Sequence, residues 1–212
     1  ASTGFGIKYN ERDIDLYSVI CGKNNIVDSI KSTMIPKLDI IPTSPNLSAL
    51  EQELVNVEDR EYLINNLIKK IKGEYDYIFI DCPPSLGLIT LNALCAVNSL
   101  IIPLQTEYYA LEGLTQLINT FDSVKNNFNK DITLQGILLT MYDKRNKISE
   151  MVSKDVKSHF NNKVFKTVIP RNVRVSEAPS YGQPVLMYDI SCPGSQAYAS
   201  LAGEIINQEK DL

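Results

Sequence analysis

The chain has 212 residues, and its 44% hydrophobic and 22% charged residues are typical of a globular protein with a packed core. Its net charge of −4 excludes a whole-surface attraction to nucleic acid, so any DNA binding has to come from a local basic patch. The four cysteines form no C-x-x-C pair, which argues against a metal site and favours a reduced, cytoplasmic compartment. No stretch reaches the length of a membrane span, so no membrane partner is expected.

In the first half of the chain, short apolar runs alternate with helical patterns. Leu38–Pro42 predicts a short buried strand, and apolar residues at helical spacing predict a helix over about Leu47–Lys72. The aromatic and β-branched stretch Tyr75–Asp81 predicts a strand, and Leu88–Val97 predicts the helix that follows it.

The second half continues this alternation. We expect strands at Ser99–Leu104, Thr133–Thr140 and Val164–Pro170, and helices at Tyr109–Phe128, Ser149–Phe160 and Ser195–Asn207. Strands that alternate with helices predict right-handed βαβ units around a mainly parallel, twisted sheet with helices on both faces. We therefore expect a single α/β domain over residues 1–212, with ligands bound at the carboxyl ends of its strands.

The first candidate site residue is Asp81, in the stretch IFIDCPPS (Ile78–Ser85). It follows three apolar residues, at the carboxyl edge of a predicted strand. A carboxylate there can hold Mg²⁺ directly or through a water, as phosphoryl transfer requires. The other interpretation is that Asp81 caps the following turn, and an apolar run ending in Asp is weak evidence by itself.

A second candidate is the loop after the Val164–Pro170 strand, where Pro170, Arg171, Asn172 and Arg174 cluster. The loop is either a solvated polar turn or a base-recognition and switch loop. An Asn side chain can offer a donor and an acceptor to a purine edge, and Pro170 can pack on its face. Composition alone favours neither interpretation.

A third candidate is the basic stretch Tyr142–Lys147, which contains Lys144, Arg145 and Lys147. Such clusters are usually solvated surfaces, but they can also bind DNA phosphates. This stretch and the loop in Val168–Pro179 both follow strands, so we expect both at one edge of the sheet. That shared placement favours DNA binding.

Two adjacent tyrosines, Tyr108 and Tyr109, open the predicted helix in EYYALEGL (Glu107–Leu114). Residue type favours a half-buried anchor. The alternative is a helix start that borders an active site or a dimer face.

Four stretches in register resemble the ParA/Soj family of partitioning ATPases, the deviant-Walker group that also includes MinD. They are DCPPSLGLITLNAL from Asp81, EYYALEGL from Glu107, LLTMYDKR ending at Arg145, and VIPRNVRVSEAPSYGQP from Val168. The resemblance runs in order over essentially the whole chain. It implies a P-loop NTPase-like fold.

The resemblance also implies roles in binding ATP and Mg²⁺. Asp81 is similar to the family's Walker B aspartate, which assists Mg²⁺ through a water. Pro170, Arg171 and Asn172 are similar to the loop that lies against the adenine.

Arg145 and Arg174 are similar to surface arginines with which the ATP-bound homodimer binds DNA without sequence specificity. The family further implies a ParB-class centromere-binding partner that stimulates hydrolysis, and a nucleoid-associated location in the cytoplasm. The expected function is thus an ATP-dependent switch in chromosome or plasmid partitioning.

The chain departs from the family pattern at its beginning. The family starts with a strand, a phosphate-binding loop with a signature lysine, a helix, and a second strand ending in a catalytic aspartate. No G-x-x-x-x-G-K-[ST] motif occurs, and the Gly22-Lys23 pair is followed by Asn24. We therefore expect the first βαβ unit to be missing, with apolar strand edges left unpaired. The intact parent resembles a weak Mg²⁺-dependent ATPase, whereas this chain alone is expected to be inactive.

Two alternatives stay open. The chain can be a non-catalytic module that binds DNA or a partner without ATP, which the missing phosphate-binding loop favours. A MinD-like membrane switch would call for an amphipathic C-terminal helix rich in Lys, and the acidic tail Glu204–Leu212 argues against it.

Overall fold

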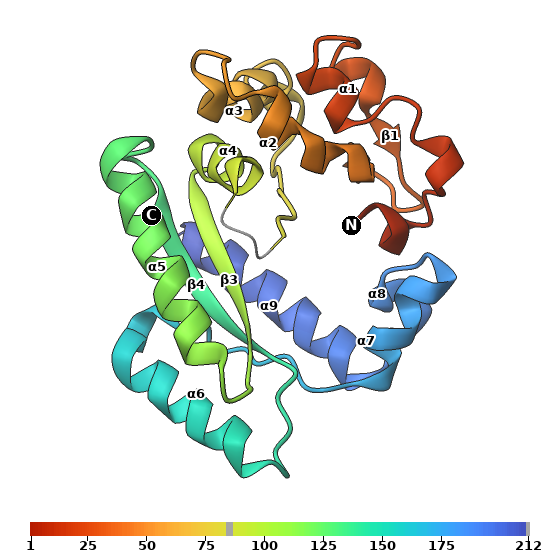
Figure 1. The fold of residues 1–212 in the computed structure, drawn as a ribbon. Coiled ribbons are helices and arrows are strands. Elements are labelled where there is room, and N and C mark those ends of the chain that lie inside the picture. Colours follow the sequence, from red (N-terminus) through yellow and green to blue (C-terminus); the bar gives the residue numbers. More distant parts are fainter. Residues whose placement is uncertain (84–86, 211–212) are drawn as a thin grey trace. The chain divides into compact units, whose positions relative to one another are not determined.

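The computed structural model describes residues 1–83 and 87–210, which form two compact units (Figure 1). Unit 1 comprises Ala1–Asn98 with Phe121–Ile132, and unit 2 comprises Ser99–Thr120 with the chain from Thr133 onward. Pro84 and Ser85 of the predicted Mg²⁺-binding stretch lie outside the described residues.

Unit 1 is built from short helices and loops. Its α-helices are α1 (Leu16–Ile20), α2 (Leu50–Glu53), α3 (Leu63–Ile68) and α4 (Leu88–Ala96). Its 3₁₀ turns are η1 (Ser2–Phe5), η2 (Tyr9–Glu11), η3 (Val27–Ser29), η4 (Pro45–Ala49), η5 (Arg60–Tyr62) and η6 (Lys72–Glu74). Two short strands, β1 (Lys31–Ser32) and β2 (Asp39–Ile40), pair antiparallel, so the strand predicted at Leu38–Pro42 forms over two residues.

The single helix predicted over Leu47–Lys72 is wrong. The chain leaves the helix after α2, and Asp59 adopts a left-handed backbone with a φ of 53° before η5 begins. Two β-branched residues, Val55 and Val57, flank Asn56 in this break, and all three have low helix propensity. The apolar residues of this region keep their helical spacing, but only α3 uses it over more than one turn.

Tyr75–Asp81 is extended but is not a strand, which corrects the second strand predicted in this half. Tyr75 has β-region angles, with φ −131° and ψ 137°. Extended chain becomes a strand only when a neighbour satisfies its backbone groups. Within the described part of unit 1, no strand pairs with this segment.

Asn92 ties α4 to the rest of unit 1. Its side chain is 2% exposed and donates to the carbonyls of Arg60 (2.8 Å) and Leu88 (3.1 Å). Its Oδ1 accepts from the backbone amide of Ile64 at 3.2 Å. The Asn92 side chain therefore joins α4 to η5 and α3. Its burial is tolerated because both polar atoms of the amide form hydrogen bonds.

Unit 2 contains a parallel pair, β3 (Ser99–Gln105) and β4 (Thr133–Thr140), with Ile102 opposite Ile137. Its α-helices are α5 (Ala110–Asn127), α6 (Lys147–Phe160), α7 (Val173–Glu177), α8 (Val185–Tyr188) and α9 (Pro193–Lys210). Only the first residues of α5 belong to this unit. The 3₁₀ turns of the unit are η7 (Asn161–Lys163) and η8 (Ala178–Tyr181). The predicted strands and long helices of this half are thus confirmed, apart from Val164–Pro170.

Val164–Pro170 runs parallel to β4 without forming a regular strand. It makes isolated bridges at Val164 and Pro170. The amides of Phe165 and Ile169 donate to Ile137 and Leu139 at 3.0 and 2.9 Å. The predicted strand therefore lies where the pattern indicated, with a partial ladder.

Helices cover both faces of this parallel layer (Figure 1). Ile137 and Leu139 of β4 pack in one cluster with residues of α5 and α6, whereas Leu138 packs with Leu201 of α9. Alternate residues of a strand point to opposite faces, so an apolar run buries both. The unit is therefore mixed α/β with a parallel sheet, as predicted. Among the described helices, none is long and apolar enough to cross a bilayer.

Candidate functional site

Two loops meet at the carboxyl edge of the parallel layer in unit 2. The amide of Tyr142 donates to the carbonyl of Ile169 at 3.1 Å, and the amide of Arg171 donates to the carbonyl of Tyr142 at 3.0 Å. The basic stretch Tyr142–Lys147 therefore lies directly beside the loop that starts at Pro170. This confirms the prediction that both loops share one edge of the sheet.

Arg145 stands out from this edge with a 90% exposed side chain. Its Nη2 and Nε contact the two carboxylate oxygens of Asp143, at 2.8 and 3.0 Å. These hydrogen bonds, with a smaller contribution from the charge of Arg171, lower the pKa of Asp143 to about 2. Sequence reasoning did not single out Asp143, although the Asp-x-Arg spacing is a signal for such a local pair. The guanidinium of Arg145 thus forms a bidentate ion pair with Asp143 and still remains exposed to solvent.

The loop residues Pro170, Arg171 and Asn172 occupy a transition from extended chain to helix. Pro170 is half-buried at its bridge to Tyr142, and Arg171 is exposed. Asn172 is the N-cap of α7, and its Oδ1 accepts from the amide of Arg174 at 3.0 Å. Asn172 thus has a structural role as a helix cap. The adenine contact assigned to these three residues stays a prediction.

Arg174 is more restrained than Arg145. Its Nη1 lies 3.0 Å from Glu177 Oε2, and its Nε lies 3.5 Å from Asp189 Oδ2. The hydrogen bond and charge of Glu177 raise the pKa of Arg174. The i,i+3 spacing from Arg174 to Glu177 was a readable signal for this pair, whereas nothing in the sequence indicated Asp189. With 52% of its side chain exposed, Arg174 still faces solvent.

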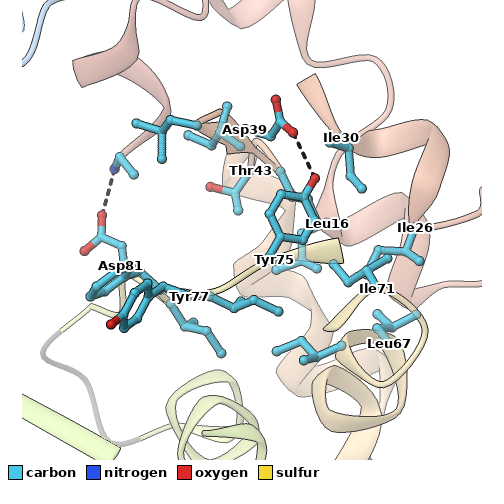
Figure 2. A pocket seen from close by; sticks show the side chains of 18 of the residues that line it. Leu16, Ile26, Ile30, Asp39, Thr43, Leu67, Ile71, Tyr75, Tyr77 and Asp81 are labelled. Carbon is cyan, nitrogen blue, oxygen red and sulfur yellow. Dashed lines mark hydrogen bonds and ion pairs between the residues drawn. The ribbon is translucent and has the colours of Figure 1, made fainter. Parts of the chain in front are cut away.

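Asp81 belongs to unit 1, unlike the other candidate residues. Its carboxylate is 70% exposed and lies 2.7 Å from the backbone nitrogen of Ala1, the first residue of the sequence (Figure 2). Among the described residues, no group of three His, Cys, Asp or Glu side chains could hold a metal ion. A single carboxylate does not fit a complete Mg·ATP site, which needs further oxygen ligands and a phosphate cradle. Asp81 is therefore one candidate contact, and no catalytic step follows from the described donors.

Tyr108 and Tyr109 are not half-buried anchors, which corrects that prediction. They are 64% and 74% exposed and meet edge to face, with ring centroids 5.2 Å apart. Both precede the first residue of α5, Ala110, so no helix packing covers them.

Comparisons with known proteins agree with this architecture. Residues 1–134 match the family model of an AAA domain. A crystal structure of cobyrinic acid a,c-diamide synthase from Mycobacterium smegmatis with bound ADP and magnesium superposes with a TM-score of 0.84. It is 28% identical, with 99% of this chain and 78% of that chain covered. The cell division ATPase MinD of Pyrococcus furiosus shares the fold at a TM-score of 0.77 and 21% identity, over 98% and 80% of the two chains. The fold is that of the P-loop NTPases.

Sequence relatives narrow this class. The chain is 50% identical over 212 residues to the chromosome partitioning protein ParA of Caulobacter vibrioides, covering 99% of this chain and 79% of the relative. It is 46% identical to the sporulation initiation inhibitor protein Soj of Bacillus subtilis, covering 97% and 81% of the two chains. The chain belongs to the ParA/Soj family, and it spans about four fifths of the length of these relatives.

Proposed function

We propose that this chain is part of an ATP-driven switch that partitions DNA, a chromosome or a plasmid. The observation that carries the proposal is its 50% identity to a relative named as a chromosome partitioning protein. The adjoining basic loops of unit 2 support it, because they present Arg145 and Arg174 to solvent at one edge of the sheet.

In this proposal, ATP joins two copies of the polypeptide, and the dimer binds DNA phosphates through both arginines. The binding is non-specific in this proposal, because contacts to phosphates carry no direct sequence information. A ParB-class protein then stimulates hydrolysis and releases the dimer. Asp81 assists Mg²⁺ through a water, and Pro170, Arg171 and Asn172 lie against the adenine.

Binding and hydrolysis of ATP by this switch need more ligands for Mg²⁺ and the phosphates than the described residues provide. The relative solved with ADP and magnesium supports nucleotide and Mg²⁺ binding in this fold. Among the described residues, Asp81 belongs to no group of three His, Cys, Asp or Glu side chains that could hold a metal ion, and these 212 residues contain no G-x-x-x-x-G-K-[ST] motif. A DNA- or partner-binding module that works without ATP is the second candidate function for the chain by itself.

The DNA role is tested with two single variants and one control. We expect Arg145→Ala and Arg174→Ala each to weaken DNA binding. For each variant, the loss of affinity should be about equal for duplexes of unrelated sequence. Each should also reduce the slope of log K against log salt by about 1, because one phosphate contact is lost. Fluorescence anisotropy measures both, with and without Mg·ATP, on this chain and on a chimera that also carries the part of the Caulobacter relative outside its match to this chain.

Arg60→Ala is the matched control, since it removes the same charge from η5 of unit 1. Binding and salt slope that are unchanged in both loop variants would remove this edge from the DNA surface. Binding by the chain itself that is equal with and without ATP would favour the module without nucleotide.

A further inference from the structure

Positive charge is concentrated in one segment of unit 2. Residues 144–174 contain nine Lys and Arg side chains and two acidic ones, although the whole chain has a net charge of −4. All nine basic residues are exposed. Four of them lie outside the two loops at the sheet edge, namely Lys154 and Lys157 in α6, Lys163 in η7, and Lys166. The two loops therefore carry only part of the positive charge of this segment.

Helix α6 has one buried and one exposed face (Figure 1). Val152 and Val156 are 1% and 0% exposed and pack against the sheet. Lys147 and Lys154 are seven residues, or two helical turns, apart, and Lys157 follows three residues later, so the three lysines lie in one row on the exposed face. At 1.5 Å per residue, this row is about 15 Å long, which matches about four base pairs of DNA.

One of these three lysines has an ion-pair partner within the described residues. Lys154 Nζ lies 2.8 Å from Glu150 Oε1, and the two side chains are 75% and 59% exposed. Their hydrogen bond lowers the pKa of Glu150 and raises that of Lys154. An exposed pair at i,i+4 spacing contributes little to stability, so a phosphate can replace the carboxylate at Lys154.

We propose that the exposed face of α6 extends the DNA surface, with Lys147 and Lys154 contacting backbone phosphates. This inference rests on the proposed function, because it takes the basic loops as the start of that surface. Arg145 stands two residues ahead of α6, so the positive charge of the loop continues directly into the row of lysines. A row of exposed ammonium groups suits a regular array of phosphates.

The apolar residues of α6 argue against a lipid surface as the occupant. A helix that binds in a membrane interface inserts its apolar face between lipids. In α6 that face is buried in the protein, through Val152 and Val156. The large apolar side chains on the exposed side are Ile148 and Met151, which are 41% and 48% exposed. DNA, which needs only the charged side chains, therefore fits this face better.

The test repeats the anisotropy measurement with Mg·ATP on the chain and on the chimera. We expect Lys147→Ala and Lys154→Ala each to weaken DNA binding about three- to tenfold. Each should also reduce the slope of log K against log salt by about 1, because one phosphate contact is lost. Lys210→Ala is the matched control, since it removes an exposed lysine from α9, which covers the other face of the sheet. It should leave affinity and slope unchanged.

Glu150→Gln tests the same face with an effect of opposite sign. We expect it to strengthen DNA binding about two- to fivefold, because Lys154 then has no competing carboxylate. A gain in affinity does not result from misfolding, so this variant decides the proposal even where a lysine variant folds poorly. Asp122→Asn, which removes an exposed carboxylate from α5, is its control and should leave the affinity unchanged.

The outcomes distinguish this inference from the proposed function. Normal DNA binding in all three α6 variants, with a loss in Arg145→Ala and Arg174→Ala, would overturn the inference and leave the proposed function in place. No DNA binding by the chain or the chimera would overturn both. If Lys147→Ala and Lys154→Ala lost binding to phosphatidylglycerol vesicles and kept their DNA affinity, the face would belong to a lipid surface and the inference would be wrong.

Discussion

Single residues of the basic edge differ in how strongly their neighbours hold them. Arg145 forms an ion pair with one carboxylate, that of Asp143, and its side chain is almost fully exposed. Arg174 contacts the carboxylates of Glu177 and Asp189, and its side chain is half-exposed. A phosphate has to compete with these partners for each guanidinium. The acidic partners therefore set how much of each positive charge is available to DNA, so substitutions of these carboxylates test DNA binding as directly as substitutions of the arginines.

We expect Asp143→Asn to strengthen DNA binding, because Arg145 then loses its competing carboxylate. The same change should alter acid unfolding. The folded-state pKa of Asp143, about 2, lies below the usual unfolded value of about 3.9, so its ion pair stabilises the fold above that value and the contribution is lost as pH falls toward 2. The variant should thus lose less stability than the original chain between about pH 4 and pH 2.

Anisotropy with duplex DNA and urea unfolding at several pH values measure the two effects. Asp122→Asn is the control, since it removes an exposed carboxylate from α5. If both variants bind DNA equally well and unfold alike in acid, Asp143 does not restrain Arg145.

At the scale of elements, Gly136 of β4 leaves no room for a side chain beside Phe165. A Cβ placed on it would lie 2.6 Å from the ring of Phe165, whose side chain is 1% exposed. The ring packs over the glycine and fixes Val164–Pro170 beside β4. The partial ladder of that segment is therefore supported by side-chain packing as well as by hydrogen bonds.

We expect Gly136→Ala to destabilise the protein by about 1–3 kcal/mol, as overpacking does in a dense core. Gly113→Ala in α5 is the matched control: no atom lies within 4 Å of its added Cβ. It should stabilise by about 0.5–1 kcal/mol through helix propensity. Urea unfolding gives both values, and equal effects of the two substitutions would show that Phe165 moves aside freely.

The sequence predicts best the elements that satisfy their own backbone or have a neighbouring strand. The helices α5, α6 and α9 follow from 3.6-residue periodicity, and β3 and β4 from apolar runs. Tyr75–Asp81 has an equally strong strand pattern, yet it is unpaired in the described structure, because pairing depends on a second strand that local propensity does not supply. The adjacency of the two basic loops was predictable from topology, whereas the pairing of Arg174 with Asp189 was not, since those residues meet only through the tertiary fold.

For the molecule as a whole, the net charge of −4 means that nucleic-acid binding depends on where the positive charges lie. Arg145 and Arg171 flank one carboxylate at the basic edge of unit 2, whereas Asp81 lies in unit 1. The arginines proposed to bind DNA and the carboxylate proposed to assist Mg²⁺ thus belong to different units.

The last prediction concerns the nucleotide. We expect this chain alone to show no Mg·ATP binding by calorimetry, because Asp81 belongs to no metal-binding group among the described residues and the 212 residues contain no G-x-x-x-x-G-K-[ST] motif for the phosphates. Its melting temperature should also stay constant as ATP rises, since a ligand stabilises a fold only by binding it. The chimera that also carries the part of the Caulobacter relative outside its match is the positive control, and there Asp81→Asn should weaken the dependence on Mg²⁺. Tight binding by the chain alone would mean that other residues hold the phosphates, and ATP-driven switching would then belong to these 212 residues themselves.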